Sequence, residues 1–119
     1  MSNPTEQFMR EVHQVIAESA GWAIGFIGPA GDIEAPSTLG KPDKVLLRRI
    51  VLSQAELRAL EALMAEVGRS IAFSIFSTID GVADRDGLEL PDLALIDRDT
   101  GKHLAEGFLH DKFYELTQD

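Results

Sequence analysis

The sequence contains no cysteine. Disulfide frameworks, zinc–thiolate sites and thiol nucleophiles are therefore excluded, and a reducing, cytoplasmic location is expected. The N-terminal residues also lack a basic start followed by an apolar core, which argues against a signal peptide. No run approaches the roughly 18 consecutive apolar residues that favour a membrane span, so no membrane contact is expected.

Basic residues are scarce. The chain has 11 Lys and Arg against 20 Asp and Glu, and its net charge is −9 over 119 residues. Nucleic-acid binding depends on cationic side chains that release counterions from phosphates, so this balance argues against DNA or RNA as a partner. A surplus of carboxylates instead favours solubility and attracts basic partners.

Catalytic and cofactor motifs are lacking as well. The sequence has no His-Glu-x-x-His zinc motif, no Gly-x-Ser-x-Gly elbow and no glycine-rich phosphate loop followed by lysine. We therefore predict no catalytic residues, no cofactor and no dedicated metal-ligand set. The pattern favours a protein that is not an enzyme.

Helical spacing and capping signals predict the helices. Asn3 and Pro4 begin one that Gly21 would end, and Ser53 with Glu56 forms a capping box for a second that ends or bends at Gly68. Polar positions at helical spacing predict a buried helix over 70–80, with a central strand over 70–79 as the alternative. A short helix is predicted over 109–116.

Four short segments are predicted to be strands. Residues 22–27, 44–52, 93–97 and 102–106 are bounded by turn residues, and Gly101 suits a hairpin turn between the last two. A long Gly- and Pro-rich connection, expected to be flexible, spans about 28–43. We thus expect one α+β domain over 1–119, in which a small antiparallel sheet packs against three to four helices, with a C-terminal hairpin and short helix over 92–117.

The segment from 80 to 99 concentrates negative charge. It holds seven of the 20 acidic residues and only two basic ones, directly after the most apolar run of the chain. We predict that it presents an anionic interaction surface to a basic protein, as small acidic inhibitor or immunity proteins do by analogy of size and charge. The predicted surface residues are Asp80, Asp84, Asp86, Glu89, Asp92, Asp97 and Asp99.

Two alternatives stay open. The carboxylates of Asp80, Asp84, Asp86 and Glu89, with His103 or His110, would suit a small metal-dependent enzyme or a metal-binding protein, although the positions of a calcium-binding loop are not matched. A basic patch, formed by Lys41, Lys44, Arg48 and Arg49, would suit an anionic ligand or partner, or a homodimer in which acidic and basic faces meet.

Overall fold

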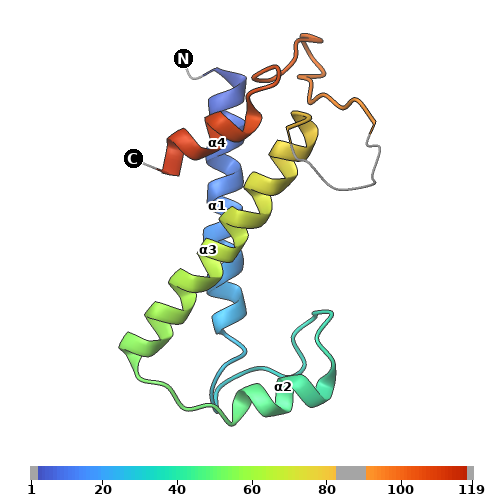
Figure 1. Cartoon of the computed structure of the whole chain (residues 1–119). Coiled ribbons are helices and arrows are strands. Elements are labelled where there is room, and N and C mark those ends of the chain that lie inside the picture. The colour runs from blue at the N-terminus through green and yellow to red at the C-terminus, as the bar shows by residue number, and fades with distance from the viewer. Residues whose placement is uncertain (1–2, 83–90, 118–119) are drawn as a thin grey trace. The chain divides into compact units, whose positions relative to one another are not determined.

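The computed structural model describes residues 3–82 and 91–117, and this part of the chain is all-helical (Figure 1). Its four helices are α1 (Pro4–Ile24), α2 (Lys41–Arg48), α3 (Gln54–Ile79) and α4 (Leu109–Thr117). They account for 60% of the described residues, which contain no strand or sheet. The predicted α+β class is therefore wrong.

The chain forms two compact units, which we name after the helix that each holds entirely. The α4 unit comprises the described residues of 1–14 and 69–119, and the α2 unit comprises residues 15–68. Both α1 and α3 contribute one segment to each unit.

The predicted strand at 22–27 is wrong because α1 continues through Gly21 as far as Ile24. Gly21 does not adopt the positive φ that would end the helix. The next three residues then form a tight turn, in which the N–H groups of 25–27 bond to the carbonyls of 22–24. A short apolar run alone does not distinguish a strand from the end of a helix.

The predicted strand at 44–52 is also wrong, since its first half belongs to α2. Gly40 has the extended backbone of an N-cap, and Pro42 lies in the first turn, where its missing N–H costs nothing. Asp43 in the first turn and Arg48 in the last complement the helix dipole. These end signals outweigh the imperfect alternation of apolar residues.

Helix α3 is one helix where two were predicted. Its start is confirmed: Ser53 N–H donates to Glu56 Oε1 (2.8 Å), and Glu56 N–H donates to Ser53 Oγ (3.1 Å). Gly68 does not end it, and it permits close packing, because a Cβ there would lie 2.8 Å from Ile16 Cγ2. Residues 70–79 are helical, as predicted, and the central-strand alternative is wrong. The predicted burial of this segment is also wrong, because Ile71, Phe73 and Ile75 are exposed.

The chain reverses direction between 97 and 102, but its flanks do not become strands. Asp97 N–H donates to the Lys102 carbonyl, Leu104 N–H donates to the Leu95 carbonyl, and Gly101 has φ +70°. Ile96 and His103 form a single isolated antiparallel bridge. The strands predicted at 93–97 and 102–106 are thus wrong, because no further strand is present among the described residues to extend the pair into a sheet.

The core of the α4 unit is aromatic. Met9, Phe76, Leu109 and Phe113 are each at most 5% exposed. The Phe113 ring lies 5.5 Å from that of Phe76, and it stacks on His13 with a centroid separation of 4.1 Å. His13 Nε2 also donates to the Phe113 carbonyl oxygen (3.0 Å). The same residue pair thus joins α1 to α4 by a ring stack and a hydrogen bond.

Candidate functional site

The acidic segment does not lie uniformly on the surface. The side chain of Asp80 is only 1% exposed, whereas Asp92 and Asp99 are exposed and Asp97 is half-buried. Asp97 Oδ1 accepts a hydrogen bond from Asp99 N–H (3.0 Å), which stabilises the turn. The remaining predicted surface residues, Asp84, Asp86 and Glu89, lie outside the described residues.

Asp80 points inward because it caps α4. Its Oδ2 atom accepts a hydrogen bond from His110 N–H (2.9 Å) and a second contact from His110 Nδ1. The residue at the N-cap position of α4 is Phe108, which has no side-chain acceptor for the first-turn N–H groups. A carboxylate from the end of α3 therefore does the work of a local cap, and it also fixes the orientation of the imidazole.

An Asp–His pair orients an imidazole in many acid–base sites, yet this one has no reacting partner among the described residues. His110 Nε2 faces Asp111, whose Oδ1 atom lies 3.5 Å away, rather than a hydroxyl or thiol. The Phe73 ring covers the imidazole edge-on at 5.6 Å. This geometry suits a structural contact better than nucleophile activation.

The metal-binding alternative gains no ligand set from the described residues. No group of three or more His, Asp or Glu side chains is placed there to hold an ion. Two of the proposed ligands are already engaged, since His110 is paired with Asp80 and His103 Nδ1 lies 3.7 Å from Glu106 Oε1. Asp84, Asp86 and Glu89, on which this alternative also depends, are outside the described ranges.

The predicted basic patch maps to α2, where its members have different environments. Lys41 is exposed and lies 3.9 Å from Glu34, and Arg49 is exposed at the C-cap. Arg48 Nη2 donates to the Pro29 carbonyl (3.2 Å).

Lys44, by contrast, is only 8% exposed. Its Nζ donates to the carbonyls of Ile33 (3.2 Å) and Ala35 (2.8 Å) and lies 5.8 Å from the centre of the Phe26 ring. Buried ammonium groups require such partners. Lys44 thus holds the 28–40 loop against α2 and is positioned as a structural group.

A row of exposed apolar side chains runs along α3. Leu63, Val67, Ile71 and Ile75 follow one another at a spacing of four residues, which places neighbours on the same side of the helix. Each is more than half exposed, at 58, 52, 56 and 52%. We call these four residues the α3 stripe. From Ser70 to Ile79 the helix carries no charge on any side, and such a helix is normally buried all round.

In the described part of the chain, α3 is also the one helix that is long and apolar enough to cross a bilayer by length and composition. Only 11% of its most apolar stretch is buried. However, its uncharged portion spans 10 residues, or about 15 Å, which is half of the roughly 30 Å hydrocarbon core.

Comparison with family models, with curated proteins and with solved structures finds no match for this chain. Its class is therefore defined by its own geometry, as an all-helical protein with an incompletely buried α3. The exposed stripe is not predicted from the sequence, which instead predicts a buried helix over 70–80. The missing N-cap at Phe108 was the one sequence signal for an acceptor such as Asp80.

Proposed function

We propose that this chain is a non-enzymatic protein-interaction module whose partner is a basic protein. The observation that carries the proposal is the exposure of Ile71 and Ile75 on the uncharged end of α3. The same unit also exposes the carboxylates of Asp92, Asp99 and Asp111. Apolar surface that the fold leaves uncovered supplies binding free energy, and the exposed charge of the same unit selects the partner.

The choice of a basic protein follows from charge. A second copy carries the same net charge of −9, so the two copies would repel each other. Anionic lipid headgroups would repel the chain in the same way. A bilayer would further have to receive Glu66 and Arg69, which lie within the apolar stretch of α3. A basic partner whose surface has an apolar centre would match both the exposed isoleucines and the exposed carboxylates of the α4 unit.

The test is capture by the immobilised chain from a lysate at low salt, compared across matched variants. Ile71→Glu and Asp99→Lys change the proposed surface. Val51→Glu and Asp43→Lys make the same chemical changes at exposed positions of the α2 unit. A true partner is one basic protein whose retention falls roughly ten-fold in the first pair, as expected for loss of a central contact, and is unchanged in the second.

Two results would reject the proposal. One is equal retention by all four variants, which would mean that capture is non-specific. The other is a stable dimer in light scattering that Ile71→Glu converts to a monomer, because the α3 stripe would then belong to a second copy.

A further inference from the structure

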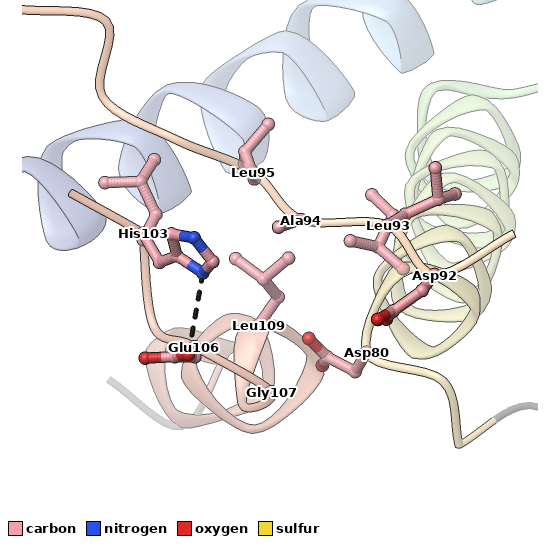
Figure 2. Close-up of a pocket in the computed structure, with 11 residues that line it drawn as sticks. Asp80, Asp92, Leu93, Ala94, Leu95, His103, Glu106, Gly107 and Leu109 are labelled. Carbon is pink, nitrogen blue, oxygen red and sulfur yellow. Dashed lines mark ion pairs between the residues drawn. The ribbon is translucent and has the colours of Figure 1, made fainter. Parts of the chain in front are cut away.

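The two units differ in charge. Residues 1–14 and 69–119 contain 13 Asp and Glu against six Lys and Arg, whereas residues 15–68 contain seven against five. The pocket at the end of α3, in the α4 unit, is accordingly lined by the carboxylates of Asp80, Asp92 and Glu106 (Figure 2). In the α2 unit, four of the five basic residues lie within 41–49, where Asp43 is the one acidic residue. This short stretch is a positive island in an acidic chain.

One side of α2 exposes apolar and cationic side chains together. Lys41, Val45 and Arg49 follow one another at a spacing of four residues, and the backbone stays helical at Arg49, so these side chains share one side of the helix. Leu46 lies beside them, three residues before Arg49. Val45 and Leu46 are 43 and 56% exposed, and Lys41 and Arg49 are exposed too. We call these four residues the α2 face.

The cations of the α2 face have little compensation from the described residues. Arg49 forms no ion pair and no side-chain hydrogen bond with any of them. Lys41 lies 3.9 Å from Glu34, but the two side chains are 71 and 78% exposed, and such surface pairs contribute little. Asp43 is two residues from Lys41 and from Val45, so it does not face them. The positive charge is therefore available to a partner.

The α2 unit holds this helix in a fixed position from its other side. Lys44 ties α2 to the 28–40 loop, and Gly28 N–H donates to the Leu47 carbonyl (3.1 Å). Both contacts leave the α2 face uncovered. A surface that is ordered before binding loses little conformational entropy on binding, which favours recognition.

Charge and geometry together define the occupant of the α2 face. Two cations with apolar side chains between them are complementary to two carboxylates with apolar side chains between them. Lys41 and Arg49 are eight residues apart, which is about 12 Å along the helix axis. On a second helix, two acidic residues eight positions apart have the same separation, and the residue midway between them lies on the same side.

We propose that the α2 face binds an acidic helical segment of a second protein, with its carboxylates against Lys41 and Arg49 and its apolar side chains on Val45 and Leu46. The surface is small, so the contact belongs to the weak and transient class. This inference goes beyond the proposed function, because it gives the chain a second binding surface whose charge is opposite to that of the first.

A protein segment suits the α2 face better than an anionic bilayer does. A segment contacts the α2 face alone, whereas a bilayer acts on the whole chain with its net charge of −9. Many helices that lie in the membrane interface are also longer, at about 20–30 residues, while α2 has eight. A second copy is disfavoured by the same net charge.

The test is a titration of the full ¹⁵N-labelled chain with a defined peptide. The probe is an acetylated, amidated helix of alanine and glutamine that carries two Glu eight positions apart and a Leu midway between them. We expect it to shift the amide signals of Val45, Leu46 and Arg49 in a saturable manner. The same peptide with Gln in place of both Glu should bind roughly ten-fold more weakly or not at all.

Matched variants of the chain locate the contact. Arg49→Glu should weaken binding roughly ten-fold, whereas Arg58→Glu, which reverses an exposed charge on α3 of the same unit, should not. Leu46→Glu should also weaken binding, with Val15→Glu as its control, because Val15 is 49% exposed on α1 of that unit.

Four results would overturn the inference. They are no saturable shift with the Glu peptide, equal binding of the Gln peptide, equal loss in Arg49→Glu and Arg58→Glu, and binding of the chain to phosphatidylserine vesicles or to a second copy that Arg49→Glu abolishes. None of them bears on the basic partner, which is tested with Ile71→Glu.

Discussion

Replacement of Asp80 by alanine should destabilise the α4 unit substantially. The substitution removes the acceptor for two donors of His110, the backbone N–H at 2.9 Å and the ring Nδ1. Loss of a helix cap costs about 1 kcal/mol, and loss of a hydrogen bond to a charged group costs about 1.5–3 kcal/mol. Because the His110 side chain is only 18% exposed, water replaces the carboxylate poorly. We therefore expect a total of about 3 kcal/mol.

This loss is large compared with the 5–15 kcal/mol that usually separates folded and unfolded states. Urea unfolding followed by circular dichroism at 222 nm measures it, and hydrogen exchange localises it. The exchange of the His110 amide should accelerate most, because it loses its acceptor. The midpoint of unfolding should fall without a large change in the slope.

Two variants make the reasoning refutable. Asp80→Asn keeps an oxygen acceptor for the His110 N–H and should cost clearly less than Asp80→Ala. Asp99→Ala removes an exposed carboxylate and should change the free energy of unfolding by no more than about 0.5 kcal/mol. A cost below about 1 kcal/mol for Asp80→Ala, or identical costs for the alanine and asparagine variants, would show that the Asp80–His110 contact does not stabilise α4 in this way.

Two further predictions concern other parts of the chain. Lys44→Met keeps the aliphatic stem but leaves the carbonyls of Ile33 and Ala35 without their donor. It should cost about 1–3 kcal/mol in urea unfolding and speed exchange in the 28–40 loop, and unchanged exchange there would contradict the role of Lys44. Hydrogen bonds from the backbone and then the hydroxyl of Ser53 lower the pKa of Glu56 below its ordinary 4.5. The carboxylate therefore stabilises the start of α3 fully above pH 4.5 and loses this effect as the pH falls through the lowered pKa. As the pH falls from 4.5 through the lowered pKa of Glu56, the difference in free energy of unfolding between wild type and Glu56→Gln should shrink. A difference that does not depend on pH would refute this role of the Glu56 carboxylate.

The helix ends that rest on local chemistry could be predicted from the sequence. Asn3 Oδ1 accepts a hydrogen bond from Glu6 N–H (2.7 Å), and the capping box at Ser53 forms as expected. These contacts join residues three apart, so the sequence contains both partners within one turn. The stretch over 70–79 was also recognised as helical, because its polar residues recur at helical spacing.

The fold class could not be predicted, because short apolar runs were assigned to strands. The run at 22–27 belongs largely to the end of α1 and the turn after it, and the run at 44–52 begins inside α2. The first run is apolar, and the second mixes apolar, partly β-branched residues with Lys44, Arg48 and Arg49. For α2 the decisive signals lie outside the run, at Gly40 and Pro42. Gly21 and Gly68 were expected to end helices, and both are accommodated within them.

The sequence predicted that the candidate site contains carboxylates, but it did not predict where their side chains lie. Clustered carboxylates were expected to face outward, whereas Asp80 lies inside the α4 unit against a histidine 30 residues away. No residue near Asp80 in the sequence indicates that His110 is its partner. The acceptor is needed because Phe108, at the N-cap of α4, has no side-chain acceptor of its own. Lys44 is a similar case, because its burial depends on carbonyls of a loop that has no regular pattern.

The stacking of His13 on Phe113 joins two residues that are 100 positions apart. While the ribosome is still making the chain, Phe76 lacks the ring of Phe113 that it packs against, because residue 113 is made later. Contacts between residues this far apart in the sequence slow folding, so we expect this contact to form late. A chain that ends before residue 109 would accordingly leave Phe76 without the aromatic ring that covers it.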